Sequence, residues 1–409
     1  MLQGVRVLDL SRVLAGPWAS QLLGDLGAEI IKIERPQGGD DTRAWGPPFF
    51  DNEDGSVGDA AYFFAANRNK KSVAIDFGQP DGAELIQELA GSSDILIENF
   101  KVGGLKKYGL DYKNVSERNP AIVYCSVTGF GQTGPKASRP GYDYMIQAMG
   151  GLMSVTGQPD GTPGGEPMKV GVAVADLFAG MYASNAILAA LRHAERTGEG
   201  QHLDVSLFDC QIAMLANQAM NFFMGGSAPK RLGNAHPNIA PYQAFETADG
   251  YIVIAVGNDT QFRALAGAIG LPVIAADKRF ETNRLRVANR DALIEFIAPQ
   301  LRLHTTVDLI AKFESAGVPA GPVQDIASVF EDPQTQARSM KVPMRRSGAG
   351  AGGGDEINVT GHPVKYSKTP AAYAIAPPTL GAHTEDILEK SLGLDAREIS
   401  ALRQRGVIA

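Results

Sequence analysis

Short apolar runs alternate with longer amphipathic runs over the first third of the chain. Residues 5–10 and 29–33 are rich in branched apolar side chains, and residues 16–26 between them have the spacing of an amphipathic helix. Repeated alternation of this kind predicts a parallel sheet flanked by helices, and therefore an α/β fold. The other strands that we expect cover residues 72–76, 94–98, 121–126 and 201–206, and the other helices cover residues 81–90 and 104–118.

The pattern changes in the middle of the chain. Residues 172–192 carry small and apolar side chains around the whole helical circumference, which predicts a buried helix. Residues 207–223 predict a second long apolar helix. Two short strands then flank a turn, at 242–246 and 251–256, and helices follow at about 258–269 and 290–301. We interpret this last stretch as a smaller second domain.

Two segments between the expected elements are unusual. Residues 35–67 are rich in Gly, Pro and Asp and are too long for an ordinary connection, so we expect them to contribute to a site or to cover one. Residues 338–356 include the low-complexity run GAGAGGGDE, and we expect a mobile surface loop there.

Composition and charge narrow the possible classes. The 409 residues carry 45 Asp and Glu against 38 Lys and Arg, and this net charge of −7 argues against a nucleic-acid coat. The two cysteines, Cys125 and Cys210, fit a reducing cytoplasm and exclude a disulfide framework. The longest apolar stretch, residues 177–191, has about 15 residues, against the roughly 20 that a membrane span needs. We therefore expect a soluble cytoplasmic protein that binds neither nucleic acid nor membrane.

Basic and amide side chains gather near the ends of the expected strands. Arg35 follows one strand, Arg68 and Lys70 immediately precede another, and Asn99 follows a third. Open α/β sheets bind ligands at such edges, so these residues could hold phosphates, although a solvated charged rim explains them equally simply. The G-x-G-x-x-G run at residues 129–134 opens no long helix, which argues against a dinucleotide site, and the six histidines lack metal-ligand spacing.

A lone carboxylate, Asp176, lies at the start of the expected buried helix, within the run GVAVADLFAG at residues 171–180. An Asp in this position most often accepts hydrogen bonds from the unpaired N–H groups at the start of the helix and interacts favourably with the helix dipole. Beside small and apolar residues it could instead act as a nucleophile toward an activated acyl group. Helix-terminal N–H groups could then stabilise the oxyanion.

At these residues the chain closely resembles the class III CoA-transferases, the family that includes formyl-CoA transferase and the α-methylacyl-CoA racemases. The similar fragments run in order from VLDLSRVLAGP at residues 7–17 to GAHT at residues 381–384. Within the family the chain looks most like the branch that transfers CoA from succinyl-CoA to a short dicarboxylate such as glutarate. The stretches that support this branch are residues 39–48, 234–243 and 282–286.

The resemblance implies that Asp176 is the nucleophile of a transferase cycle. Asp176 would attack the donor thioester to give an aspartyl anhydride and free CoA thiolate. The thiolate would then attack the anhydride, release the donor acid and leave an aspartyl-CoA thioester. The acceptor carboxylate would repeat these two steps in reverse order. Acyl-CoA is then a substrate, and neither a permanent cofactor nor a metal is expected. The implied CoA contacts are Leu14, Ala15, Arg35, Lys70, Asn99, Phe100 and Lys107, and the implied contacts of the acceptor acid are Arg68, Tyr142 and Arg286.

The family also implies an architecture. It is an interlocked homodimer, in which a Rossmann-like large domain made of residues 1–224 and 330–409 accompanies a small α+β domain of residues 225–329. A Gly-rich loop that closes the site would correspond to residues 224–234.

Two other functions stay open, both on the same scaffold. One is an acyl-CoA racemase or isomerase, which is disfavoured because Tyr142 stands where the racemases use a His base. The other is an acyl-CoA-binding protein without chemistry. The acceptor also stays open among glutarate, malate, itaconate, mesaconate and a sulfinate analogue of succinate.

Overall fold

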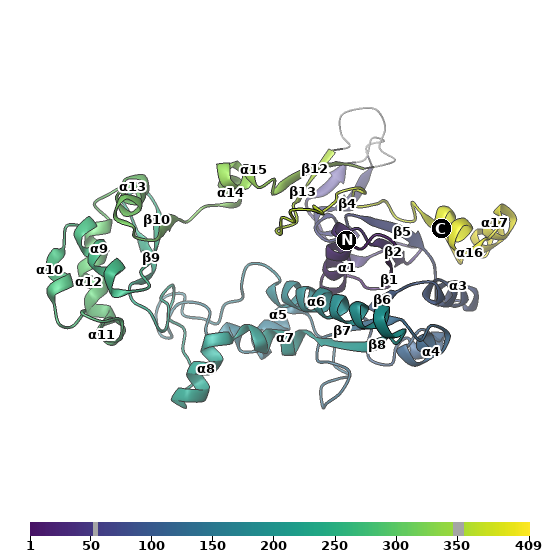
Figure 1. The fold of residues 1–409 in the computed structure, drawn as a ribbon, viewed down its shortest axis with the longest axis horizontal. Coiled ribbons are helices and arrows are strands. Elements are labelled where there is room, and N and C mark those ends of the chain that lie inside the picture. Colours follow the sequence, from purple (N-terminus) through teal and green to yellow (C-terminus); the bar gives the residue numbers. More distant parts are fainter. Residues whose placement is uncertain (52–55, 347–355) are drawn as a thin grey trace. The chain divides into compact units, whose positions relative to one another are not determined.

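The computed structural model describes residues 1–51, 56–346 and 356–409 (Figure 1). The chain divides into two compact units. Unit 1 comprises residues 1–152, 170–220 and 334–409, and unit 2 comprises residues 153–169 and 221–333. We expected residues 153–169 in the large domain, but they belong to the same unit as the middle of the chain. The middle of the expected loop at 338–356 lies outside the described residues.

Unit 1 contains a six-stranded parallel sheet, as the alternating pattern predicts. The strand order is β5-β2-β1-β6-β7-β8, so β1 (Arg6–Asp9) lies between β2 (Glu29–Glu34) and β6 (Ile95–Glu98). From β1 the chain builds first toward one edge of the sheet and then toward the other. The remaining strands are β5 (Lys70–Ala74), β7 (Val123–Thr128) and β8 (Gln201–Ser206).

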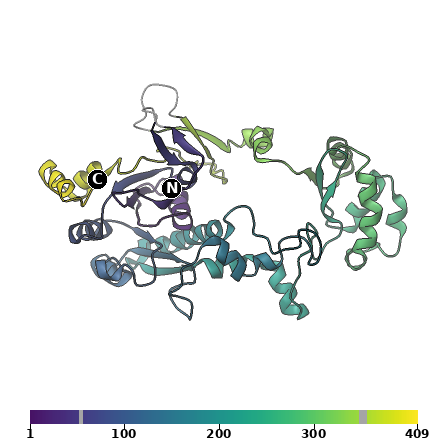
Figure 2. The ribbon, with the colours of Figure 1, turned by 180° about the vertical axis from the view of Figure 1, so that it is seen from behind.

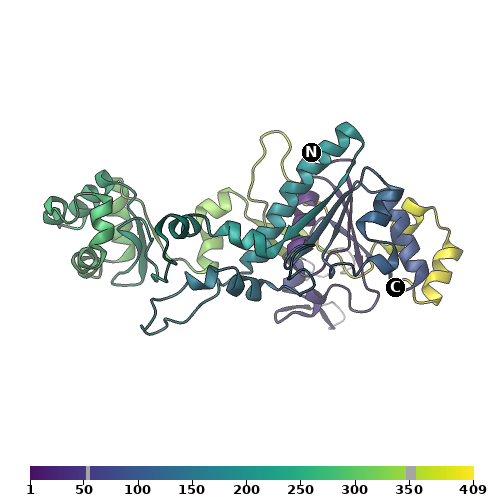
Figure 3. The same ribbon diagram turned by 90° about the horizontal axis from the view of Figure 1, so that it is seen from below.

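Helices cover both faces of this sheet because neighbouring strand residues point to opposite sides. Val7 packs into a core with α1 (Ala15–Asp25) and α6 (Val174–Thr197). Leu8 packs into a second core on the other face. Figure 3 shows the yellow C-terminal helices on the opposite side of the sheet from α6. The helices of the second face are α3 (Pro80–Gly91), α4 (Tyr112–Arg118), α16 (Thr384–Leu392) and α17 (Ala396–Gln404).

Helix α6 is buried on one face only, so the prediction of a helix buried all round is wrong. Ala179 and Ala183 are fully buried, whereas Met181 and Tyr182 are 51% and 47% exposed. The sheet and α1 cover just one side of the helix. By length and composition α6 could also cross a membrane, but the buried core helix of a soluble protein passes the same test, and 44% of its most apolar window is buried.

Two predicted helices are interrupted at residues with positive φ. The run 207–223 forms α7 (Leu207–Met214) and α8 (Ala216–Gly225), because the chain bends at Ala216, whose φ is +42°. The run 104–118 forms a 3₁₀ turn, η2 (Lys106–Tyr108), and then α4. Gly109, with a φ of +66°, ends that turn. Apolar composition continues across the first break and hides it, whereas at the second break Gly109 is a helix-ending signal that the sequence does contain.

The insertion at 35–67 and the C-terminal region add small elements to unit 1. They are η1 (Asp41–Ala44), β3 (Phe49–Asp51), β4 (Val57–Ala60), α2 (Ala61–Phe64), β12 (Lys341–Arg345) and β13 (Glu356–Thr360). Two further short elements, α5 (Asp143–Met149) and η3 (Leu152–Ser154), precede α6 in the chain.

Unit 2 is built around an antiparallel sheet of β9 (Tyr242–Glu246), β10 (Tyr251–Ala255) and β11 (Ala320–Pro322). Figure 2 shows the green helices of this unit gathered against that sheet. Their shared core includes Ile252, Ile254 and Phe262. These helices are α9 (Asp259–Ala268), α10 (Pro272–Ala276), α11 (Asn283–Ala288), α12 (Arg290–Leu301) and α13 (Thr306–Ala316). α14 (Ile326–Glu331), which has no buried residue, follows β11, and α15 (Pro333–Ala337) begins at the unit's end.

Helices α1 and α6 approach each other at backbone distance. A Cβ atom added to Gly180 in α6 would lie 2.7 Å from the carbonyl oxygen of Ala15 at the start of α1. This contact is closer than side chains allow, so glycine is required at this point. It places the first residue of α1 beside α6, one helical turn after Asp176.

We expect Gly180→Ala to lower the free energy of unfolding by about 1–3 kcal/mol, because the new methyl group meets a backbone oxygen that can move only with α1. Denaturant unfolding measures the change. Gly91→Ala in α3 is the control, since its added Cβ would meet nothing within 4 Å. Its effect should stay within about 0.5 kcal/mol. An equal loss in both variants would contradict this account of the α1–α6 contact.

Candidate active site

A cavity of about 770 Å³ opens in unit 1 at the carboxyl ends of β1, β6 and β7. Because β1 and β6 are neighbours whose chains lead toward opposite edges, this is the switch point at which doubly wound sheets bind ligands. The residues that line it include Arg12, Val13, Leu14, Ala15, Asp41, Trp45, Phe77, Asn99, Phe100, Lys101, Lys107, Tyr108, Gly129, Arg139, Gly141, Tyr142 and Asp176.

Asp176 lies in the first turn of α6 and contributes the carboxylate of this cavity nearest to the α1–α6 contact. Within the residues that the structure describes, its carboxylate makes no hydrogen bond or ion pair. Burial and, secondarily, the negative charge of Asp143 raise the pKa of Asp176 to about 7. A carboxylate kept without partners in a cavity is more basic than usual and is free to react.

Asp143 fixes the start of the helix that carries Asp176. Its Oδ1 accepts the backbone N–H of Ala175 at 2.8 Å, and its Oδ2 accepts the side-chain amide of Gln147 at 2.7 Å. The Gln147 carbonyl in turn accepts the N–H of Val170 at 2.9 Å. The helix cap that we weighed for Asp176 is therefore supplied by Asp143, which leaves the Asp176 carboxylate unengaged.

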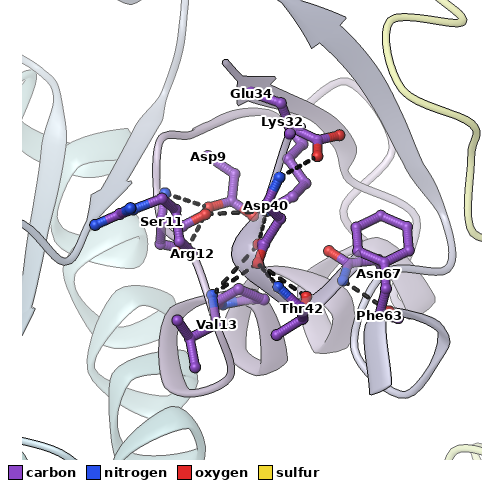
Figure 4. Close-up of polar contacts among 12 residues, drawn as sticks. Asp9, Ser11, Arg12, Val13, Lys32, Glu34, Asp40, Thr42, Phe63 and Asn67 are labelled. Atoms are coloured by element: carbon purple, nitrogen blue, oxygen red, sulfur yellow. Dashed lines mark hydrogen bonds and ion pairs between the residues drawn. The ribbon is translucent and has the colours of Figure 1, made fainter. Parts of the chain in front are cut away.

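Buried ion pairs lie beside the turn that leads from β1 into α1, and Figure 4 shows the Lys32–Asp40 pair. Lys32 Nζ contacts Asp40 Oδ2 at 2.9 Å, and Lys70 Nζ contacts Asp9 Oδ2 at 3.2 Å, with all four side chains fully buried. Burial alone would raise the pKa of Asp9, but the charges of Lys70 and Lys32 outweigh it and lower that pKa. These pairs anchor the turn that leads from β1 into α1.

The structure brings most of the implied contact residues to the cavity. Leu14, Ala15, Asn99, Phe100, Lys107, Tyr142 and Asp176 all line it. The amide of Asn99 is engaged by the backbone of Arg12, since its Oδ1 accepts the Arg12 N–H at 2.9 Å and its Nδ2 donates to the Arg12 carbonyl at 2.6 Å. Asn99 therefore shapes the β1–α1 turn as well as lining the cavity.

Arg35 reaches the cavity only through another residue. Its exposed guanidinium contacts Asp41 Oδ1 at 2.7 Å, and Asp41 lines the cavity and also pairs with Arg12 at 2.9 Å. Asp41 and Trp45 both come from the insertion at 35–67, which thus contributes to the cavity as we expected. Residues 52–55 of that insertion lie outside the described part of the chain.

Lys70 and Arg68 do not line the cavity. Lys70 is fully buried and donates to Pro17 and Asn67 as well as to Asp9. Arg68 is also buried, and its Nε and Nη2 bond the two oxygens of Asp25 at 2.8 and 2.5 Å. Their donors already serve the fold, so the contacts with ligand that the resemblance implies lack support from this geometry.

Arg286 is fully buried inside unit 2. Its guanidinium donates to the carbonyls of Ala240 and Phe280 at 2.8 and 3.0 Å and to Asp259 Oδ1 at 2.7 Å. It also stacks over the ring of Phe262. This arrangement joins α11 to α9 and to the segment that precedes β9. The sequence suggested a binding role because the arginine matches a family stretch, but its partners are distant in sequence and could not be read from it.

Three cationic cavity residues, Arg12, Lys101 and Arg139, escaped sequence reasoning. Arg12 has a buried Nε without a partner among the described residues, and its guanidinium lies over the Phe100 ring. Arg139 lies in the stretch after the G-x-G-x-x-G run, which we discounted because it opens no helix. The glycines of that run were the available signal. A Cβ atom added to Gly129 would lie 2.5 Å from the Cα of Gly141, so glycine at position 129 lets the two loop segments pack backbone to backbone.

The segment expected to close the site, residues 224–234, belongs to unit 2. Arg231 ties it to the preceding loop of that unit by donating to the carbonyls of Gln158 and Gly165, and Gly233 N–H donates to Gly157. Among the described residues no group of three or more His, Cys, Asp or Glu side chains could hold a metal ion.

Comparison with known proteins defines the class. A family model described as CoA-transferase family III matches residues 2–384. The chain therefore belongs to CoA-transferase family III, and it is an enzyme that transfers CoA.

Several relatives are similar over almost the whole chain. A protein of Agrobacterium fabrum named succinate–glutarate CoA-transferase is 50% identical over 387 residues, which are 95% of this chain and 94% of the relative. A mouse protein named succinyl-CoA:glutarate CoA-transferase is 43% identical over 100% of this chain and 90% of its own length. A solved structure of a CAIB/BAIF family protein from Brucella suis has a TM-score of 0.83 and 49% identity, covering 95% of this chain and 99% of that chain.

The environment of Asp176 predicts a dependence of stability on pH. Its folded-state pKa, about 7, lies above the usual 3.8, so the folded protein holds the proton more tightly and loses stability as pH rises through this range. Asp176→Asn removes the ionisation. Thermal unfolding should show the variant more stable than the parent at pH 8 by on the order of 1–2 kcal/mol, with the gain vanishing near pH 4.

Asp386→Asn is the control for this measurement. Asp386 is an exposed carboxyl in the same unit, and a hydrogen bond from Lys390 lowers its pKa. Its replacement should give no gain at pH 8. If Asp176→Asn also gave no gain there, the carboxyl of Asp176 would not be destabilised in the folded state.

Proposed function

We propose that this enzyme transfers CoA from succinyl-CoA to glutarate or a closely related short dicarboxylate, with Asp176 as the covalent nucleophile. The observation that carries the proposal is the unpartnered Asp176 carboxylate in a cavity at the switch point of the sheet. The substrates follow from the names of the relatives that are 50% and 43% identical to this chain.

The cycle conserves the energy of the thioester bond. An Asp176 oxygen attacks the succinyl carbonyl carbon, and the carbon–sulfur bond breaks, which gives a mixed anhydride and CoA thiolate. The thiolate then attacks the aspartyl carbonyl, which releases succinate and leaves an aspartyl-CoA thioester. The acceptor carboxylate repeats both steps in reverse order, so acyl-CoA product leaves and Asp176 returns as a carboxylate.

The lining of the cavity suits such substrates. Phe77, Phe100 and Tyr108 form an aromatic cluster with ring centroids 5.4 to 5.6 Å apart, which offers a surface to the adenine or the pantetheine arm. Lys101, Lys107 and Arg139 line the same cavity and supply cations for phosphate or carboxylate groups. Apolar side chains such as Val13, Leu14 and Leu207 line the same cavity, and they reduce the access of water, which would hydrolyse the anhydride.

The interlocked homodimer of the family belongs to the same proposal. Apolar side chains exposed on α6 and α8 support a subunit interface: Phe178, Met181, Tyr182, Met220, Phe222 and Phe223. On α6, the rings of Phe178 and Tyr182 contact each other at the surface, and exposed apolar side chains that lie together often mark a protein interface. Sedimentation at low concentration should give a dimer, and a freely dissociating monomer would contradict the interlocked arrangement.

Covalent catalysis can be tested directly. After incubation with succinyl-CoA, mass spectrometry of the peptide that carries Asp176 should reveal an added acyl or CoA group. Asp176→Asn should show no adduct, and its CoA transfer to glutarate should fall by at least about 10³-fold, because the variant has no ionisable nucleophile. A panel of dicarboxylates with succinyl-CoA as donor ranks the acceptors. Undiminished transfer by the variant would exclude this mechanism.

The pH profile of transfer should report the ionisation of Asp176. Only the carboxylate attacks, so kcat/KM for succinyl-CoA should fall as pH drops below about 7. Asp143→Asn removes the neighbouring negative charge, lowers the pKa of Asp176 and should move this acid limb to lower pH. Asp143→Glu keeps the charge and serves as the control. An acid limb that stayed in place in Asp143→Asn would show that Asp143 does not influence the nucleophile.

A further inference from the structure

The turn from β1 into α1, residues 11–15, is held by side chains at each of its first three residues. Ser11 donates its N–H to Asp9 Oδ1 at 2.9 Å and accepts Lys32 Nζ at its carbonyl at 2.9 Å. Arg12 exchanges two hydrogen bonds with the amide of Asn99. These partners come from three strands of the sheet or the residues directly after them, so the turn is fixed from several sides.

The third residue, Val13, has an unfavourable backbone conformation. Its φ is +72°, in the left-handed region that a β-branched side chain rarely adopts. Its N–H points between the two carboxylate oxygens of Asp40, at 3.2 and 3.3 Å (Figure 4). Among the non-glycine residues with positive φ in the described ranges, Val13 is the β-branched one. Such strain persists only where surrounding groups impose it.

Asp40 is well suited to impose that conformation, because it is itself immobilised. Besides Lys32, it binds the N–H of Thr42 at 3.0 Å and the Thr42 hydroxyl at 2.8 Å, and its own N–H donates to Glu34 Oε2 at 2.9 Å. Burial opposes ionisation, but the charge and hydrogen bond of Lys32 prevail and lower the pKa of Asp40 to about 2. Asp40 is therefore a permanent, fixed acceptor.

The conformation of Val13 determines where the next residues lie. Val13, Leu14 and Ala15 line the cavity together with Asp176, and the Ala15 carbonyl packs against Gly180, one helical turn from Asp176. If Val13 relaxed to a negative φ, the chain would leave β1 in another direction, and this wall would move away from the nucleophile.

We propose that Asp40 is a positioning residue for CoA transfer: by holding Val13 in the left-handed conformation, it fixes the wall formed by Val13, Leu14 and Ala15 against which the acyl thioester meets Asp176. The expected effect on kcat rests on the proposed function, whereas the effect of Asp40 on the conformation of Val13 does not. Asp40 touches no substrate, so it acts through the backbone of the turn and should influence kcat more than the binding of either substrate.

The first test compares Asp40→Asn with the parent enzyme. The variant keeps an oxygen acceptor but loses the charge, so its hold on Val13 weakens. Amide hydrogen exchange of a peptide covering residues 11–15 should become faster. With succinyl-CoA and glutarate, kcat should fall about 10- to 100-fold while both KM values change by less than about threefold. Unchanged exchange together with unchanged kcat would overturn the proposal.

Rescue separates positioning from general damage. Glycine adopts φ near +72° without strain, so Val13→Gly in the Asp40→Asn background should restore kcat by at least about fivefold. No recovery in the double variant would overturn the proposed link between Asp40 and Val13. If Asp40→Asn fails to fold, the double variant Lys32→Met/Asp40→Asn replaces it, because this variant removes both charges of the buried pair. The kcat of that double variant is then compared with and without Val13→Gly.

The matched control is Asp59→Asn. Asp59 accepts Arg43 Nη1 at 2.8 Å and also pairs with Arg346, so its replacement removes a charge from the adjoining buried network, yet Asp59 bonds none of residues 11–15. This variant should lose stability but keep its kcat, and a loss of kcat equal to that of Asp40→Asn would overturn the proposal. A parent enzyme that transfers no CoA to any dicarboxylate would instead refute the proposed function, and the exchange comparison would still decide whether Asp40 holds Val13.

Discussion

Two fully buried ion pairs, Lys32 with Asp40 and Lys70 with Asp9, support the region from which the active-site loops emerge. Removing one partner of such a pair leaves an uncompensated charge in the interior, which typically costs about 3–5 kcal/mol. The pairs join β1, β2, β5 and the insertion after β2 at a single point. They therefore fix the carboxyl end of the sheet, and this fixed region determines the conformation of the turn from β1 into α1.

The site depends on two carboxylates in opposite environments. Asp40 is surrounded by Lys32 and several donors, which keep it ionised and unreactive. Asp176 is partly buried, meets no hydrogen-bond donor among the described residues and lies near the negative charge of Asp143, so its pKa is raised to about 7. The two environments therefore shift the pKa values of the two carboxyl groups in opposite directions, as is common where one protein uses several carboxyl groups for different tasks. Asp176 lies one helical turn before the close contact between Gly180 of α6 and the carbonyl of Ala15 in α1.

The cations of the chain also fall into two groups, those that are buried in the interior and those that line the cavity. Arg68, Lys70 and Arg286 are buried and satisfied by carboxylates or carbonyls, so they stabilise the interiors of their units. Arg12, Lys101, Lys107 and Arg139 line the cavity instead, and this set gives an acidic protein a local affinity for anionic substrates. A net charge of −7 says nothing about such an arrangement, because it sums over the whole chain.

The sequence by itself determined the α/β class and the strands of the parallel sheet, and it singled out Asp176, which the fold places in the cavity. Neighbouring strand residues such as Val7 and Leu8 face two different cores, so both must be apolar, and a short continuous apolar run in the sequence marks the strand. Tertiary structure alone decided which cations line the cavity. Arg68 meets Asp25, 43 residues away, and Val13 meets Asp40, 27 residues away. A local pattern records which residues are buried, whereas the partner of a buried charge depends on which distant segments the fold brings together.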